Sequence, residues 1–385
     1  MDRIAVRLTA ELIGLDADQW SGTITTGATA SNLLGLAIGR EGVCAGAAEE
    51  GLAEKGRVQV FCAQAHAGVR KVASLVGIGR KHVVDCGRTT DPAAPLQEQI
   101  RSSVEFDMDL LERRIKACTG GAIVVVGFGE VNTGALSAQI PALRALCDNY
   151  HAWLHVDAAF AAFVSLVPDL SWAASHLALA DSLTTDGHKQ LNLPYDVALL
   201  LTRREGSLQQ VCRTGASYLG AGPLDVGIEN SRRFRALPLY AALLSQGREG
   251  YAALVERNLA FAESVANYLR GDERYELLTP DCELANQDYG PKAWTGRWST
   301  IVVLFRAHPR RCPVATYADA KTGHTALSDA IKATRKMYVT PTSVLSGRVG
   351  AIRLAVSNWA TGPDDLVVIR RVLDDVMRPK AGSVA

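Results

Sequence analysis

The chain lacks an excess of charge of either sign. Its 385 residues include 41 basic and 40 acidic side chains, which give a formal net charge of +1. Such a balance produces no extended field that would attract nucleic acid or an anionic membrane surface. The sequence therefore predicts a small molecule as the partner, and neither a nucleic acid nor a membrane.

The chain also lacks the cysteine pattern of a disulfide-rich secreted protein. Its eight cysteines are scattered without a C-x-x-C pair, and a chain of this length needs no disulfide framework to fold. No apolar stretch is long enough to cross a bilayer, and Asp2 and Glu11 interrupt the region where a signal peptide would be apolar. These absences predict a cytoplasmic location.

The residues that are present have the pattern of a two-domain α/β protein. The chain exceeds the size at which a single core stops growing, and it contains no internal repeat or low-complexity tract. Apolar runs such as 122–126, 153–156 and 197–201 alternate with amphipathic segments, which is typical of a mostly parallel sheet with helical crossovers. We expect a large domain at residues 1–255 and a smaller α+β domain at residues 256–385.

Two charged residues in the large domain adjoin apolar runs. Asp157 ends one predicted strand, and α/β proteins bind ligands at the carboxyl ends of their strands. A buried carboxylate must meet a cation, which is either a core arginine or the protonated ring nitrogen of a cofactor. Lys189 follows His188 and precedes an apolar run, where a lysine is either a nucleophile or an ordinary solvated charge. A lysine and an acid are the two partners that pyridoxal 5'-phosphate requires, one for its aldehyde and one for its ring nitrogen.

A small polar loop at residues 25–32 precedes the apolar run at residues 33–38. The free backbone N–H groups of a helix that begins there would favour a phosphate, although the same residue types also cap helices without any ligand. His66 lies in the segment Gln64-Ala65-His66-Ala67-Gly68. It is a candidate for stacking on a cofactor ring, with a structural histidine as the alternative.

Two further patterns resemble binding motifs without meeting their geometry. Gly127-Phe128-Gly129 follows a strand, but the next glycine is Gly134, which is too distant for a dinucleotide-binding fingerprint. His151 and His155 have the spacing of helical zinc ligands, yet His155 lies in a predicted strand, where four residues span about 13 Å. We therefore expect neither a dinucleotide nor a metal site.

Together, these motifs resemble those of the pyridoxal-phosphate-dependent group II amino acid decarboxylases, which include the aromatic amino acid, tyrosine, histidine and glutamate decarboxylases. The similarity runs in order along nearly the whole chain, through residues 26–32, 64–66, 132–135, 153–159, 184–196, 217–219, 231–237 and 357–361. The resemblance implies a fold type I, transferase-like enzyme with a mostly parallel large domain and a smaller α+β C-terminal domain. It also implies a homodimer with the active site at the interface.

The resemblance further implies a role for each motif. Lys189 would form the Schiff base with the cofactor, Asp157 would pair with its ring nitrogen, and His66 would stack on its ring. Tyr218, on a loop rich in glycine and proline, would return a proton to Cα after carbon dioxide leaves. The implied cofactor-binding residues are Lys189, Asp157, Ala159, His66, Gly27, Ala28, Thr29 and His188, and the implied catalytic residues are Lys189, Tyr218, His66 and Asp157.

The chain departs from the family pattern at several positions. Gln190 replaces the tryptophan often found after the lysine, Glu130 and Val131 stand where many members carry threonines, and Ala28 occupies a usual glycine. The chain also begins where its relatives are already well under way, so we expect the N-terminal segment that wraps the dimer to be absent.

The sequence thus predicts decarboxylation of an L-amino acid to its amine, with an aromatic substrate slightly preferred because such members are frequent in the family. Two alternatives stay open. One is an aldehyde synthase, although those enzymes tend to carry phenylalanine at the position of Tyr218. The other is a catalytically silent homologue that dimerises with a fuller partner.

Overall fold

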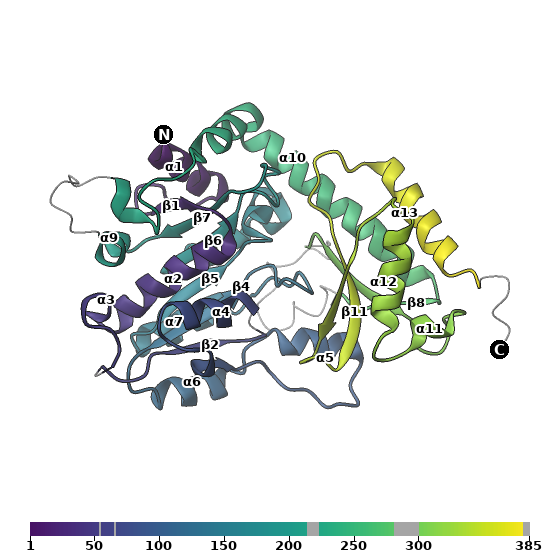
Figure 1. Cartoon of the computed structure of the whole chain (residues 1–385), viewed down its shortest axis with the longest axis horizontal. Helices are drawn as coiled ribbons and strands as arrows, with labels where there is room; N and C mark the ends of the chain where they lie inside the picture. The colour runs from purple at the N-terminus through teal and green to yellow at the C-terminus, as the bar shows by residue number, and fades with distance from the viewer. Residues whose placement is uncertain (54, 65–66, 214–222, 281–299, 380–385) are drawn as a thin grey trace.

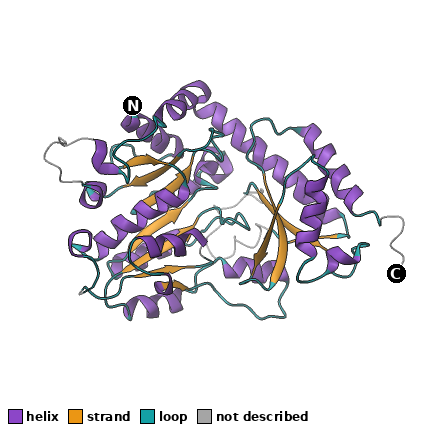
Figure 2. Cartoon of the chain, in the orientation of Figure 1, coloured by secondary structure: helices purple, strands orange, loops and turns teal. Residues whose placement is uncertain are grey.

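Two β-sheets organise the chain in the computed structural model, which describes residues 1–385 except 54, 65–66, 214–222, 281–299 and 380–385 (Figures 1 and 2). The larger sheet has seven strands in the order β1-β7-β6-β5-β4-β2-β3, and the smaller has four in the order β10-β11-β9-β8. The larger sheet with its helices confirms the predicted α/β class.

The larger sheet is built from short strands with the bounds β1 Ser21–Thr25, β2 Gln59–Cys62, β3 Val83–Asp85, β4 Ala122–Gly127, β5 Trp153–Asp157, β6 Ser182–Asp186 and β7 Ala198–Thr202. Strands β3, β2, β4, β5 and β6 are parallel to their neighbours in this group. Strand β7 is antiparallel to both β6 and β1. The sheet is therefore mostly parallel, and β7 is the exception to the predicted direction.

Alternating residues of the central strands enter two different cores. In β4, Val124 and Val126 belong to the larger apolar cluster, while Ile123 and Val125 belong to the second. Because both faces are covered, the strand has no polar side to alternate with, and its sequence is a continuous apolar run. The helices of this part of the chain are α1 Asp2–Ile13, α2 Ala28–Val43, α3 Ala47–Glu50, α4 Ala67–Leu75, α5 Leu96–Ser103, α6 Met108–Lys116, α7 Ile140–Asn149, α8 Trp172–Leu177 and α9 Ser207–Cys212.

Helix α2 lies unusually close to β5 because its glycines face that strand. A Cβ at Gly35 would lie 2.4 Å from Cε1 of His155, and a Cβ at Gly42 would lie 2.6 Å from Cε3 of Trp153. Such distances are too short for real side chains, so only glycine permits this approach. The close packing brings Asn32, near the start of α2, against the carboxyl end of β5.

The smaller sheet contains β8 Tyr275–Leu277, β9 Val302–Ala307, β10 Thr340–Val344 and β11 Val349–Ala355, with α11 Ala315–Ala318, α12 Gly323–Ala333 and α13 Pro363–Val376 beside it. All its strand pairs are antiparallel. Helix α10, Ala236–Gly271, packs against α1 of the larger unit and against β8 and α13 of the smaller one, with a break at Gly247. The proposed domain boundary at residues 255 and 256 falls within this helix.

No helix in the described part of the chain has both the length and the apolar character that are needed to cross a membrane.

Candidate active site

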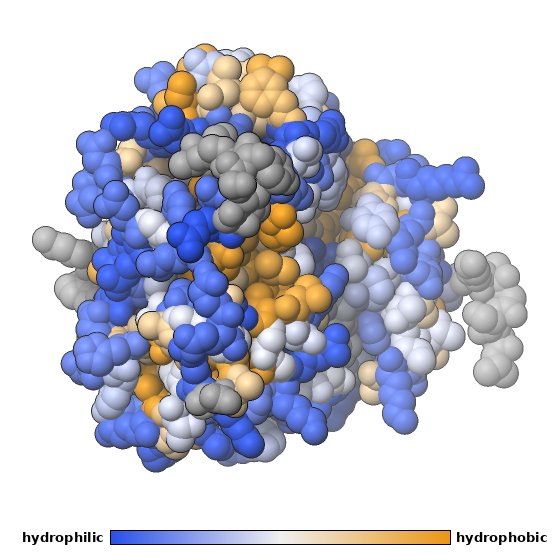
Figure 3. All heavy atoms as spheres, turned by 60° about the vertical axis from the view of Figure 1, so that its left-hand side comes forward, coloured by the Kyte–Doolittle hydropathy of each residue, from blue (hydrophilic) through white to orange (hydrophobic). Residues whose placement is uncertain are grey.

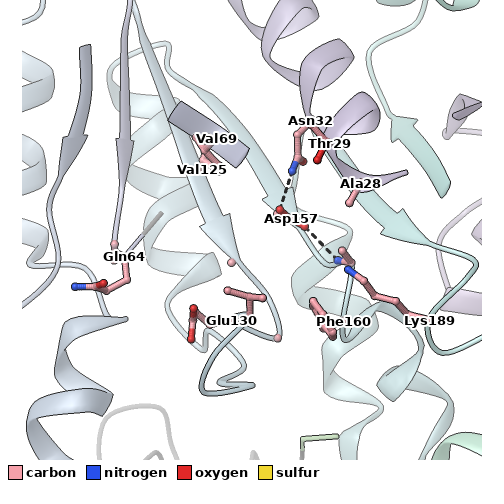
Figure 4. A pocket seen from close by; sticks show the side chains of 15 residues that line it. Ala28, Thr29, Asn32, Gln64, Val69, Val125, Glu130, Asp157, Phe160 and Lys189 are labelled. Carbon is pink, nitrogen blue, oxygen red and sulfur yellow. Dashed lines mark hydrogen bonds between the residues drawn. The ribbon is translucent and has the colours of Figure 1, made fainter. Parts of the chain in front are cut away.

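A pocket opens where the carboxyl ends of β4 and β5 meet the beginning of α2 (Figure 4). Its position is the one where open α/β sheets bind ligands, as the sequence predicts for Asp157. The residues that line it are Ala28, Thr29, Asn32, Ala63, Gln64, Val69, Val125, Gly127, Gly129, Glu130, Val131, Asp157, Ala159, Phe160 and Lys189.

Asp157 is held at the end of β5 by two hydrogen bonds. Nδ2 of Asn32 donates to Oδ2 of Asp157 at 2.7 Å, and the backbone N–H of Ala159 donates to Oδ1 at 3.2 Å. Figure 4 shows Asn32 directed at Asp157 from α2, with Lys189 and Phe160 on the other side of the carboxylate. Both donors are neutral groups, so these bonds fix the position of the carboxylate without neutralising its charge. Asp157 therefore presents a fixed negative charge to the pocket.

A buried chain of hydrogen bonds extends behind Asn32. Oδ1 of Asn32 lies 2.9 Å from Nε2 of His155, and Nδ1 of His155 lies 2.7 Å from Oγ of Ser182. Nε1 of Trp153 donates to the same Oγ at 2.8 Å. Each of these side chains is at least nine-tenths buried.

Burial lowers the pKa of His155 to about 4, while the nearby charge of Asp157 acts in the opposite direction. The neutral ring has a single proton, and Oδ1 of Asn32 can only accept, so Nε2 of His155 is the donor. Nδ1 then accepts from the hydroxyl of Ser182. These hydrogen bonds therefore all donate in one direction, from Ser182 to His155 and from His155 to Asn32. They orient the amide of Asn32 with its NH₂ toward Asp157.

Lys189 lies across the pocket in an ion pair that the sequence did not reveal. Its Nζ is 2.8 Å from Oδ2 of Asp186, whose side chain is 2% exposed, and 3.7 Å from the ring centroid of Phe160. Oδ1 of Asp186 also accepts from the backbone N–H of Ala28 at 3.0 Å. One carboxylate therefore joins Lys189 to the first turn of α2.

Gly27 occupies the N-cap position of α2 and provides no side-chain cap. A Cβ at Gly27 would lie 3.7 Å from Cε1 of His188, so the His188 ring lies beside this helix start. Nε2 of His188 is 3.5 Å from Oδ2 of Asp186, and its ring stacks at 4.3 Å on Tyr195. The residues implied to contact a phosphate therefore gather at one helix N-terminus.

Two charged residues near the mouth of the pocket had no assigned role in the sequence. Glu130, which is 9% exposed, follows β4. Arg353 comes from β11 of the smaller sheet, and its guanidinium carbon lies 4.7 Å from the ring centroid of Phe160. Nη2 of Arg353 is buried without a hydrogen-bond partner among the described residues. No local pattern marks such an arginine, because only the packing of the two sheets brings it to the site.

The predicted site residues within the described part of the chain do come together. Lys189, Asp157, Ala159, Ala28 and Thr29 line or border one pocket, and Gly27 and His188 adjoin it. His66 and Tyr218 lie outside the described residues. Gln190, which replaces the family's tryptophan, is 2% exposed and accepts from the backbone N–H of Phe163 at 3.2 Å.

Solved structures share this architecture. A crystal structure of Oryza sativa TDC with PLP and tryptamine superposes with a TM-score of 0.80 at 20% identity, over 98% of this chain and 75% of that one. Mouse CSAD in its apo form gives a TM-score of 0.78 at 17% identity, over 98% of this chain and 75% of that one. The protein therefore has the fold of the fold type I pyridoxal-phosphate enzymes.

The family follows from the sequence match. Residues 1–286 match the model of the pyridoxal-dependent decarboxylase conserved domain, and the chain belongs to this family. It is 29% identical over 273 residues to an aromatic-L-amino-acid decarboxylase of Bacillus atrophaeus, covering 68% of this chain and 54% of that protein. It is 25% identical over 285 residues to an L-2,4-diaminobutyrate decarboxylase of Acinetobacter baumannii, covering 67% of this chain and 53% of that protein. The chain thus spans about half the length of the curated relatives that it matches.

Proposed function

We propose that the chain binds pyridoxal 5'-phosphate in this pocket and decarboxylates an L-amino acid to the corresponding amine. The observation that carries the proposal is the placement of Lys189 and Asp157 in one pocket, beside the N-terminus of α2. A lysine, a fixed carboxylate and a helix start match the aldehyde, the ring nitrogen and the phosphate of this cofactor.

The residues of the pocket fit the cofactor in charge as well as in type. Asp157 receives only neutral donors from the described protein, so a cationic ring nitrogen would complete its surroundings. The start of α2 has no side-chain cap, and the acceptor at its first N–H is the Asp186 carboxylate. We infer that a phosphate held by Gly27, Ala28, Thr29 and His188 would share this helix start with Asp186.

When bound, pyridoxal phosphate would supply an electron-withdrawing ring for the electron pair of the Cα–carboxylate bond. Asp157 would hold a proton at the ring nitrogen, and Asn32 and Ala159 hold the Asp157 carboxylate in place. Lys189 would hold the cofactor through its Nζ amine. Asp186, whose Oδ2 lies 2.8 Å from this Nζ, would be the ionic partner of the lysine whenever its amine is free.

Arg353 is the group that we infer to bind the α-carboxylate of the substrate. A buried guanidinium N–H without a partner costs about 1–3 kcal/mol, and Nη2 of Arg353 has no partner among the described residues. A substrate carboxylate would satisfy this donor and neutralise its charge. The guanidinium and Nζ of Lys189 both lie against Phe160, so carboxylate and amine of one small substrate would be held on the same side of the pocket.

A second copy of the chain is the proposed partner. Figure 3 shows apolar surface in the centre and along the upper rim of one face, surrounded by hydrophilic residues. The exposed apolar side chains of α1 and of the first part of α10 include Ile4, Leu237 and Leu244, which are 51%, 50% and 60% exposed. These helices pack against each other, so the side chains belong to one region. Apolar residues exposed at this density favour burial in a protein interface.

The substrate and the location of the protein also remain proposals. An aromatic amino acid keeps its slight preference, which the name of the Bacillus atrophaeus relative supports, while the Acinetobacter baumannii relative acts on a basic amino acid by its name. A cytoplasmic location is proposed from the scattered cysteine pattern of the sequence.

The proposal is tested with the purified chain and added pyridoxal phosphate. We expect a visible absorption band and, after borohydride reduction, a covalent adduct on the peptide that contains Lys189. Across the common amino acids and L-2,4-diaminobutyrate, amine and carbon dioxide should form in equal amounts. Lys189→Ala should abolish both, whereas Lys116→Ala on the exposed face of α6 should change neither.

Three results would point elsewhere. A chain that stays colourless with added cofactor would contradict the cofactor site. Aldehyde in place of amine would favour the aldehyde synthase. A coloured chain without turnover would favour the silent homologue.

A further inference from the structure

Glu130 folds a tight turn at residues 130–135, directly after β4. Its Oε2 accepts from the backbone N–H of Asn132 at 3.1 Å, from the backbone N–H of Thr133 at 2.7 Å and from the hydroxyl of Thr133 at 2.8 Å. The backbone N–H of Gly134 donates to the carbonyl of Glu130 at 2.6 Å, which closes the turn. Charge-assisted bonds to one oxygen make this carboxylate the organising group of the turn.

The same turn is where the two sheets meet at the pocket. The hydroxyl of Thr342 in β10 donates to Oδ1 of Asn132 at 2.7 Å. A Cβ at Gly134, whose φ is +70°, would lie 1.6 Å from Oγ1 of Thr300, next to β9. Only glycine therefore allows the turn to approach the smaller sheet this closely.

Arg353 is fixed by this turn. Its Nε donates to the backbone carbonyl of Val131, the residue after Glu130. Burial lowers the pKa of Arg353 from the ordinary arginine range, and the carboxylate of Glu130 acts against this by favouring the charged form. Nε is bound to Val131 and the guanidinium lies against Phe160, while Nη2 is buried without a partner among the described residues.

We propose that Glu130 is a positioning residue, which sets Arg353 to receive the α-carboxylate of the substrate by folding the turn whose Val131 carbonyl holds the guanidinium. This inference rests on the proposed function, because it assumes that an amino acid enters the pocket. It gives a role to a position at which the chain departs from the threonine of many relatives. Glu130 touches neither cofactor nor substrate in this role.

The test compares ligands with and without a carboxylate. The full chain is loaded with pyridoxal phosphate, and binding is followed by the change in its visible spectrum immediately after mixing, before the amino acid is converted to its amine. The probes are L-phenylalanine with phenethylamine, and L-2,4-diaminobutyrate with 1,3-diaminopropane. Wild type should bind at least one amino acid more tightly than the matching amine, because only the amino acid engages Arg353.

Glu130→Ala should weaken binding of that amino acid by about ten-fold, as for the loss of one charge-assisted bond, and should leave the amine unaffected. Glu130→Gln keeps an acceptor oxygen for the turn, so its affinity for the amino acid should lie between those of wild type and Glu130→Ala. Arg353→Gln should remove the preference for the amino acid, and adding Glu130→Ala to it should cause no further loss, because the first residue acts through the second.

Glu41→Ala is the matched control. Glu41 also accepts from two backbone N–H groups, those of Gly46 at 2.6 Å and Ala48 at 2.8 Å, but in a turn away from the pocket. Glu41→Ala should leave the affinities for all four probes unchanged. Circular dichroism and retained cofactor show that each variant is folded.

Several results would overturn the inference. Glu130→Ala could weaken the amine as much as the amino acid, or leave both unchanged, or add its effect to that of Arg353→Gln. A loss confined to the diaminobutyrate pair would instead assign Glu130 to direct recognition of a cationic side chain. Failure of wild type to bind pyridoxal phosphate would refute the proposed function itself, which is a distinct outcome.

Discussion

His155 makes the stability of the fold depend on pH in a way that can be measured. The ring is fully buried and neutral, between Asn32 and Ser182. Its pKa is about 4 in the folded chain against 6.5 for an ordinary histidine. Between these two values the unfolded chain binds a proton that the folded chain does not. The free energy of unfolding therefore decreases as the pH falls through this interval and is fully restored above pH 6.5.

The size of the effect follows from the same two values. Each unit between them corresponds to about 1.4 kcal/mol, so wild type should lose about 3 kcal/mol between pH 6.5 and pH 4 through this residue alone. The physical cost is the transfer of a charged imidazole into a site where Nδ1 now accepts from Ser182. That hydroxyl would have to turn away.

The assay is urea denaturation of wild type and His155→Gln at several values between pH 7 and pH 4, followed by circular dichroism. The amide of glutamine does not titrate in this range, so the variant lacks the contribution of His155 while the other groups are shared. Burial also lowers the pKa of His176, but this contribution is common to both proteins. We expect the wild-type midpoint to fall more steeply with acid. Equal slopes for the two proteins would refute the neutral, buried state of His155.

Three further predictions concern the proposed reaction and assembly. Asp157→Asn should keep the fold but lower turnover at least about a hundred-fold, since charge stabilisation of this kind is commonly worth a few kcal/mol; normal turnover in a kinetic assay would make Asp157 a structural carboxylate. Tyr218→Phe should still release carbon dioxide but raise the ratio of aldehyde to amine in air, and an unchanged ratio at comparable turnover would remove Tyr218 from the mechanism. Leu244→Lys, at a position that is 60% exposed, should shift the protein from dimer to monomer in analytical ultracentrifugation, whereas a wild-type monomer would contradict the proposed interface.

The sequence predicts the elements of the fold well wherever burial determines the residue types. The apolar runs at 122–126 and 153–156 are β4 and β5 in the structure, within one residue at their ends. The run at 197–201 is β7, but its antiparallel direction could not be inferred, because a strand buried on both faces has the same composition in either direction. Direction depends on the connection between strands and on what lies at the edge of the sheet.

The residues of the candidate site also differ in whether the sequence alone could predict them. Lys189 and Asp157 could be predicted because each stands out against its neighbours along the chain. The chain of hydrogen bonds from Asn32 to Ser182 could not, because its members are brought together only by the packing of α2 on β5 and β6. Arg353 meets the turn that follows Glu130 only where the two sheets approach each other. The roles of these residues remain predictions until the variants are measured.

The pairing of β1 with β7 has a consequence for how the protein is made. Ser21 and Thr202, which form one end of this pairing, are 181 residues apart in the chain. During synthesis, β1 and the start of α2 emerge before β7, the strand with which β1 pairs. Contacts this distant in sequence form slowly, and a strand that waits for its partner is exposed to aggregation. The end of the pocket at which we propose that a phosphate binds therefore matures only when the sheet closes, so cofactor present at that moment would favour the closed sheet by binding it.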